Sequence, residues 1–205
     1  MERTAHIASV PYQPDLFADV ADLEPAVPGL SCSGLLLDPR EQADAVKLIE
    51  GLSLTPFRFG PWTGRRETIS FGWHYDFERG GVSLADPMPD WLVRIRQMVA
   101  EAFSDPADMY EQALLIRYRP GAVIGWHRDR PQFGTVAGLS LGSPATMRLR
   151  RRSASGFERT NFALEPGAAY RLDGEARHEW EHSIAALPET RWSISFRSIA
   201  RPIAG

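Results

Sequence analysis

Apolar residues recur with a helical period in two stretches of the N-terminal half. Asp38 is a favourable N-cap, Pro39 suits the first helical position, and Glu41 completes a capping box. The apolar face of this first helix would consist of Ala45, Leu48, Ile49 and Leu52. A second helix is predicted from about residue 89 to 103, with apolar positions Trp91, Leu92, Ile95, Met98, Val99 and Phe103.

Most of the remaining chain has the pattern of short β-strands. Gly- and Pro-containing turns, such as Arg119-Pro120-Gly121 and Glu165-Pro166-Gly167, separate the apolar segments. Strands are predicted at residues 32–37, 68–77, 113–118, 136–141, 146–151, 157–164, 168–172 and 191–199. This order predicts a mostly β fold, a double-sheet jelly roll or barrel, preceded by two helices.

Composition fits one soluble domain, with 205 residues of which 43% are hydrophobic and 24% charged. The net charge of −3 gives no overall attraction to nucleic acid or to an acidic membrane, although arginines cluster at residues 148–152. No apolar run approaches the roughly 18 residues of a membrane span. The single cysteine, Cys32, cannot form an intrachain disulfide. We expect a cytoplasmic protein without a membrane segment, and the sequence indicates no obligate protein partner.

Two histidines and a carboxylate form a candidate metal site. On a strand, residues two apart point to the same side, so His127 and Asp129 can present their side chains to one ion. His182, from a distant strand, would supply a third ligand. Two histidines and one carboxylate are typical of non-haem Fe(II) oxygenases, which need open coordination positions. An isolated H-x-D pair is also open to a structural or accidental interpretation.

The segment from Arg191 to Arg197 alternates strictly between apolar and polar residues. One face would carry Arg191, Ser193, Ser195 and Arg197. If this face is buried, the two arginines need anions, because an unpaired buried charge is costly. A dicarboxylate such as 2-oxoglutarate would satisfy both. The alternative is an edge strand with exposed arginines.

A zinc-protease motif overlaps the third candidate ligand. Residues 178–182 read H-E-x-x-H, which on a helix would place His178 and His182 around zinc. The segment follows Asp173-Gly174 closely and meets Pro188 soon afterwards, so a long helix is not expected. We therefore favour His182 as an iron ligand and His178 as a residue at the surface or the pocket rim.

Several of these segments together resemble the AlkB-like Fe(II)/2-oxoglutarate dioxygenases. The matching segments, in order, are residues 117–122, 127–129, 138–142, 174–184 and 191–197. Upstream, residues 65–66 and 70–75 look like the substrate-covering segment of that family. The resemblance implies an α+β, mostly β, double-stranded β-helix (jelly roll) with two N-terminal supporting helices. Residues 1–27 would be an extended lead-in and 28–205 one dioxygenase domain, with the substrate-covering segment at about 55–80 and the jelly-roll core at about 110–200.

The resemblance also assigns roles to individual residues. It makes His127, Asp129 and His182 the ligands of Fe(II). Arg191 would bind the distal carboxylate of 2-oxoglutarate and Arg197 the end that chelates iron. The cosubstrate-binding set would be Tyr118, Arg191, Ser193, Ser195 and Arg197, and the substrate-binding set Arg65, Arg66, Trp73 and Tyr75. Two departures concern Ile116, where the bacterial repair enzyme has an asparagine, and Pro131, where it has an acidic residue beside the base.

The implied reaction is oxidation of an N-alkyl group by O₂ and 2-oxoglutarate, which releases formaldehyde, succinate and CO₂. The expected substrate is alkylated DNA or RNA, and the arginines at 148–152 are candidate phosphate contacts, or alternatively a solvated strand face. One alternative is the same oxygenase chemistry on a protein or a small molecule. Another is a jelly-roll binding module without catalysis.

Overall fold

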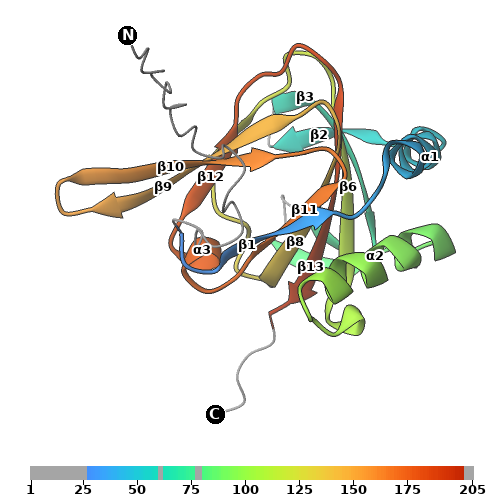
Figure 1. Ribbon diagram of the computed structural model, residues 1–205, viewed down its shortest axis with the longest axis horizontal. Coiled ribbons are helices and arrows are strands. Elements are labelled where there is room, and N and C mark those ends of the chain that lie inside the picture. The colour runs from blue at the N-terminus through green and yellow to red at the C-terminus, as the bar shows by residue number, and fades with distance from the viewer. Residues whose placement is uncertain (1–26, 60–61, 77–79, 201–205) are drawn as a thin grey trace, which may run out of the picture.

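Two facing antiparallel sheets form the body of the computed structural model, which describes residues 27–59, 62–76 and 80–200 (Figure 1). The larger sheet has, in spatial order, β1 (Leu30–Leu35), β11 (Ala168–Leu172), β8 (Phe133–Gly142), β13 (Arg191–Ile199), β6 (Gln112–Tyr118), β3 (Trp62–Phe71) and β2 (Thr55–Phe59). The smaller sheet has β10 (Gly156–Leu164), β9 (Ala145–Ser153), β12 (Glu181–Ile184) and β7 (Ile124–His127). A separate hairpin pairs β4 (Trp73–Asp76) with β5 (Gly81–Leu84). The predicted mostly β jelly roll is confirmed.

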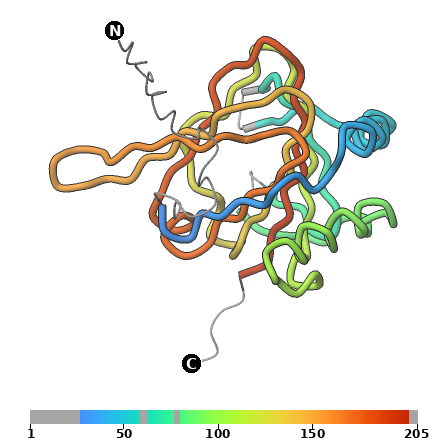
Figure 2. Tube along the Cα trace, viewed as in Figure 1, coloured from blue at the N-terminus to red at the C-terminus, as the bar shows by residue number. Residues whose placement is uncertain are grey.

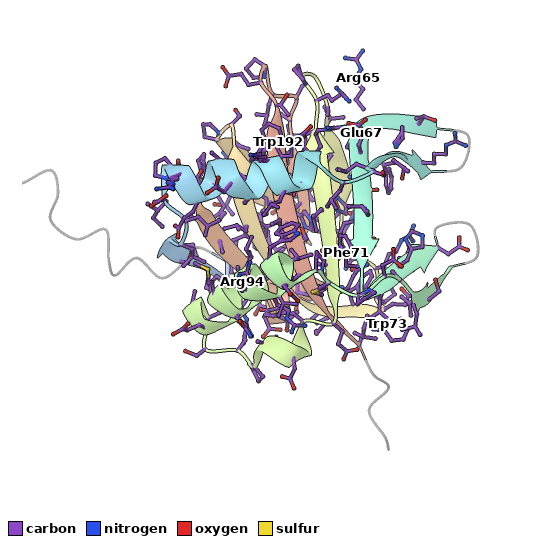
Figure 3. The ribbon with its side chains drawn as sticks, turned by 90° about the vertical axis from the view of Figure 1, so that its right-hand side faces the viewer. Arg65, Glu67, Phe71, Trp73, Arg94 and Trp192 are labelled. Carbon is purple, nitrogen blue, oxygen red and sulfur yellow. The ribbon has the colours of Figure 1, made fainter. Side chains whose placement is uncertain are left out.

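The two predicted helices pack on the outer face of the larger sheet, where they cross it one above the other (Figure 3). These are α1 (Pro39–Glu50) and α2 (Asp90–Ala102), and a short α3 (Gly174–His178) and a 3₁₀ turn (Ala107–Met109) follow later. The predicted capping box is present, because Asp38 accepts hydrogen bonds from the Arg40 and Glu41 amides and Glu41 caps the Asp38 amide. None of the described helices is long and apolar enough to span a membrane.

Burial of the helix faces explains why they lie on the sheet. Ile49 of α1 and Leu92 of α2 are fully buried, in one cluster with Ile194 and Phe196 of β13. Leu48, expected on the same face of α1, is instead 44% exposed, so the buried stripe is narrower than its apolar pattern. The Trp192 indole, which lies by α1 in Figure 3, donates a hydrogen bond to Glu50 at the end of that helix.

The inner face of the larger sheet is polar along its middle strands. Cross-strand pairing places Arg191 of β13 beside Tyr118 of β6, which is itself beside Arg66 of β3. Farther along β13, Ser193 lies beside Ser140 of β8. A second buried cluster is apolar and includes Met147, Leu149, Leu172, Trp180 and Ile184. The fold therefore leaves one polar region between the two sheets.

The largest error in the predicted elements is the strand at 68–77. The structure has β3 and β4 there, separated at Gly72, which adopts a φ of 75°. A Cβ at this glycine would lie 2.0 Å from the Glu111 carbonyl oxygen, so the chain bends where only glycine fits. The short strands β2, β5, β7 and β12 and helix α3 were not predicted as separate elements. The expected lead-in, apart from Val27, lies outside the described residues.

Candidate active site

The two candidate histidines lie side by side on neighbouring strands of the smaller sheet. His127 of β7 pairs directly with His182 of β12, and their ring centroids are 4.3 Å apart. His127 Nδ1 lies 2.9 Å from the Gly125 carbonyl oxygen. Because a carbonyl can only accept, Nδ1 donates and Nε2 keeps its lone pair for a metal. Burial, followed by the charge of His127, lowers the pKa of His182 to about 4, so this imidazole is neutral at pH 7, as a metal ligand must be.

Asp129 lies two residues beyond the end of β7, so strand alternation does not position it as expected. Its Oδ1 accepts a hydrogen bond of 3.2 Å from Nη2 of Arg197. Burial alone would raise the pKa of this carboxyl, but Arg197, followed by the two imidazoles, holds it well below its usual range. The carboxylate is therefore charged over the whole physiological range.

The chemistry of these three side chains fits Fe(II). Two imidazoles and one ionised carboxylate border the same cavity, and this donor set leaves coordination positions open. Within the described part of the chain, no three His, Cys, Asp or Glu side chains converge as a ready-made metal group, and Asp129 is engaged with Arg197. The structure thus brings the predicted ligands together around one space without itself assigning them to a metal.

Arg191 is buried at one end of the polar face of β13. It is 1% exposed, and its Nε and Nη2 donate to Ser140 Oγ over 3.3 and 3.1 Å. Its guanidinium carbon lies 5.1 Å from the centroid of the Tyr118 ring. Among the described residues, its buried Nη1 has no hydrogen-bond partner. An arginine with an unused donor in this position is prepared to bind an anion.

Arg197 lies at the other end of the same face and is 9% exposed. Besides Asp129, it donates to Gln112 Oε1 over 3.2 Å, and its buried Nε finds no acceptor in the described part of the chain. Ser193 and Ser195, between the two arginines, are also buried. The prediction that this polar face lies inside the jelly roll is confirmed, and the edge-strand alternative is wrong because β13 pairs with β6 and β8.

These groups border an open cavity of about 1130 Å³, larger than the roughly 300–1,000 Å³ typical of small-molecule sites. Among the residues that the structure describes, its wall has more cations than carboxylates. The charged residues of the wall are Arg58, Arg66, Arg128, Arg130, Arg191, Arg197, Asp76 and Asp129. The guanidinium of Arg66 stacks 3.7 Å from the Phe57 ring, and burial lowers its pKa. The cavity has room for a dicarboxylate and for part of a larger substrate.

The predicted substrate residues divide into two groups. Arg66 and Tyr75 line the cavity, and Tyr75 packs on Phe133 with Arg130 above its ring. Arg65 and Trp73 are not among the residues that line it. Arg65 is exposed and borders a separate shallow depression, and Figure 3 shows both residues toward the periphery. The remainder of the predicted covering segment includes residues outside those described.

Ile116, Pro131 and the H-E-x-x-H segment lie in different surroundings. Of the two departures from the family pattern, Ile116 lines the cavity, whereas Pro131 is exposed and absent from its wall. The H-E-x-x-H segment is not one helix, because His178 ends α3 and His182 belongs to β12. The rejection of a zinc-protease helix is confirmed, and His178 is exposed.

Four site residues were not singled out from the sequence. Ser140 and Gln112 orient the two arginines, and Tyr170 lines the cavity opposite Gly138. Arg177, which is buried, donates to the backbone carbonyl oxygens of Arg130, Phe133 and Gly134 and so fixes the turn that follows Asp129. Ser140 and Gln112 could have been found from the sequence, because each is a polar residue in an otherwise apolar strand. Nothing in the local sequence signals Arg177.

Comparisons with known proteins agree with this geometry. Residues 69–197 match the 2OG-Fe(II) oxygenase superfamily. The chain is similar to alpha-ketoglutarate-dependent dioxygenase alkB homolog 7, mitochondrial, from Bos taurus, with 36% identity over 92 residues, and to the Mus musculus protein of the same name, with 32% over 94 residues. These matches cover 44% and 45% of this chain. They span 41% and 42% of the relatives' lengths, about two fifths.

Solved structures share the fold at low sequence identity. OsALKBH1 superposes with a TM-score of 0.63 and 15% identity over 86% of this chain and 100% of its own. A Pseudomonas putida prolyl-4-hydroxylase gives 0.54 and 17% over 85% and 94% of the two chains. The match over residues 69–197 shows that the chain belongs to the 2OG-Fe(II) oxygenase superfamily, whose members use Fe(II) and 2-oxoglutarate, and within that superfamily it is similar to AlkB homologues.

Proposed function

We propose that this oxygenase oxidatively demethylates N-alkylated bases of DNA or RNA and releases formaldehyde, succinate and CO₂. The observation that carries the proposal is the wall of the cavity beside His127 and His182. Aromatic rings of Phe57, Tyr75 and Trp126 line it together with arginines. Aromatic rings can stack on a base taken out of its stack, and arginines can hold its phosphates.

The proposal assigns the three candidate ligands to iron. His127, Asp129 and His182 would hold Fe(II), which together with 2-oxoglutarate and O₂ supplies the oxidising chemistry for a C–H bond. The protein keeps His182 neutral by burial and keeps Asp129 ionised through Arg197. Carbonyl contacts of Arg177 hold the turn behind Asp129, so the carboxylate needs little reorganisation.

The polar face of β13 would bind the cosubstrate. Arg191, with Tyr118, would bind the distal carboxylate, and its buried Nη1, which has no partner among the described residues, supports this role. Arg197 lies beside Asp129 and would therefore bind the end nearer the metal. Ser193 and Ser195 lie between them and would add hydrogen bonds. Arg66 and Tyr75, which line the cavity, would contact the substrate.

The test is turnover on a panel of methylated single- and double-stranded DNA and RNA. Formaldehyde and succinate should form together on at least one nucleic acid, with Asp129→Ala as the inactive control. If succinate forms without nucleic acid but no methylated strand yields formaldehyde, the proposed substrate class is wrong, and proteins and small molecules become the substrates to screen.

A further inference from the structure

The hairpin of β9 and β10 projects from the body of the protein, away from α1 and α2 (Figure 1, Figure 2). Its two broad faces differ in charge balance. Arg151 points to one face, where Glu158, Glu175 and Glu179 bind its guanidinium over 2.7–3.1 Å. Three carboxylates thus surround one guanidinium on this face, and the contacts to Glu175 and Glu179 join the hairpin to α3 and the residue after it.

The opposite face carries the even-numbered arginines of β9. Alternation places Arg148, Arg150 and Arg152 on it, and pairing with β10 adds Arg159, directly opposite Arg150. Within β9, β10 and β12, the acidic residue on this face is Glu181, which binds Arg150 over 2.6 Å. In these three described strands, four cations on this face thus have one carboxylate between them. Like charges directly opposite one another destabilise a sheet, so the fold alone does not explain this pairing.

Aromatic rings hold these arginines in a row. Arg150 lies 4.7 Å from the centroid of Phe157, and Arg152 and Arg159 lie 5.3 Å from the same ring. Arg150 also lies 4.4 Å from the centroid of Trp126. Stacking orders the guanidiniums while their N–H groups at the edge of the plane can still bind an anion.

The row runs toward the active site. Trp126 precedes the candidate iron ligand His127 and borders the cavity. Arg148 donates to Ser183, which follows His182. Alternate residues of a strand are about 7 Å apart, so the arginines form a narrow track that an extended chain of phosphates can follow. A base entering the cavity must be unpaired, and its flanking strand would then lie on this track.

We propose that the outer face of β9 and β10 is a binding track for the phosphate backbone of single-stranded nucleic acid. This face is defined by Arg148, Arg150, Arg152, Phe157 and Arg159. The proposal rests on the proposed function for the identity of the polyanion. The track provides affinity without sequence preference, because guanidinium groups bind phosphates and not base edges.

Binding of a fluorescent, unmethylated single-stranded DNA of mixed sequence tests the track. Arg152 and Arg159 are exposed and far from the cavity, so we would compare Arg152→Gln/Arg159→Gln with the parent protein from about 50 to 200 mM salt. Affinity should fall about tenfold or more, and the slope of log affinity against log salt should shrink by about 1.4, since each lost contact to a single strand removes about 0.7. The charge-preserving Arg152→Lys/Arg159→Lys should retain the slope.

The matched control is Arg40→Gln/Arg94→Gln, which removes two exposed arginines from α1 and α2 on the other side of the molecule. It should bind like the parent. The track is refuted if the parent does not bind the strand, if both Gln pairs weaken binding equally, or if the hairpin variant changes binding only to anionic lipid vesicles.

Failure of the track and failure of the proposed function are distinguishable. If the strand binds through the hairpin but no methylated nucleic acid yields formaldehyde, the track stands and the demethylase proposal fails. If formaldehyde is released while Arg152→Gln/Arg159→Gln binds like the parent, the demethylase proposal stands and the track fails.

Discussion

Strands β13 and β9 each carry two or more arginines on one face, yet the inner row on β13 and the outer row on β9 have opposite surroundings. Arg191 and Arg197 of β13 face the space between the sheets and are almost fully buried. Arg148 and Arg152 of β9 face outward and are exposed. Alternation therefore tells which residues share a face, whereas the neighbours of the strand decide whether that face is inside. β13 lies inside the larger sheet with helices behind it, while the β9–β10 hairpin extends beyond the other strands of the smaller sheet.

The arginines of the two rows also differ in the groups that contact them. The inner row is held by neutral hydroxyl and amide groups and by Asp129, and it retains buried donors without partners in the described chain. The outer row is stacked on aromatic rings and is open to water and salt. Buried charges depend strongly on a partner, and exposed ones only weakly. Substitutions in the two rows should therefore have different consequences.

The largest effect is expected for Asp129→Asn, which keeps the shape of the side chain and removes its charge. Turnover of 2-oxoglutarate should fall by more than about 100-fold, because even the outer-shell partners of metal ligands typically contribute about 10- to 100-fold. Succinate formation and Fe(II) binding measure this. Asp108→Asn, at an exposed carboxylate in the 3₁₀ turn, is the control. Comparable activity of the two variants would remove Asp129 from the iron site.

Arg191→Met, in the inner row, should weaken binding of 2-oxoglutarate without lowering the free energy of unfolding. The KM for 2-oxoglutarate should rise about 30-fold or more, since truncating one partner of a buried charge pair costs about 2–5 kcal/mol. Without cosubstrate, the free energy of unfolding should be unchanged or greater, because an unpaired buried donor is removed. Urea unfolding with and without 2-oxoglutarate measures both. A loss of stability above about 2 kcal/mol would mean that Arg191 is structural.

Gly138→Ala tests how tightly the inner row is enclosed. A Cβ at this position of β8 would lie 2.4 Å from the Tyr170 ring, so the ring must shift toward the cavity. We expect a decrease of about 1–3 kcal/mol in the free energy of unfolding, as for other overpacked interiors. Gly34→Ala, where the added atom meets open space, should change it by no more than about 0.5 kcal/mol. Equal effects would show that the interior adapts freely.

The smallest effect is expected for Arg150→Gln in the outer row. Its ion pair with Glu181 lies on a partly exposed sheet surface, where such pairs contribute about 0–1 kcal/mol. Loss of the Arg150 charge also relieves repulsion with Arg159 across the hairpin. Thermal unfolding at low and high salt should show a change below about 1 kcal/mol. A larger loss would place this row among the structural elements of the fold.

Sequence patterns predicted structure best where a single element is long enough to show its own alternation or cap. The limits of β13 match the prediction, and its buried polar face follows from alternation and the cost of unpaired arginines. The cap of α1 is similarly local. By contrast, β7 and β12 have four residues each, too few for a period to emerge, although they carry both histidines. Strand alternation therefore misplaced Asp129, which lies past the end of β7.

Contacts between distant segments could not be predicted from the sequence. Arg177 binds backbone carbonyls more than forty residues away, and a carbonyl has no sequence signature. Trp73 was expected at the substrate, but it lies outside the cavity wall, whereas the other three residues of β4 line the cavity. Residues 117–129 and 174–197 suggested a family because they contain several short motifs in a fixed order. A periodicity of apolar residues does not record such an order.

The attachment of Arg177 has an implication for how this chain tolerates change in length. Arg177 ties the turn after Asp129 to α3, which leads to His182, while β9 and β10 lie between these two segments in sequence. The relative position of Asp129 and His182 consequently does not depend on the length of the β9–β10 hairpin. Insertions or deletions near Ala154 and Ser155 at its tip would lengthen or shorten the arm and leave the oxygenase centre in register. The hairpin is thus the place where related chains can diverge in size, and where a binding module can be grafted.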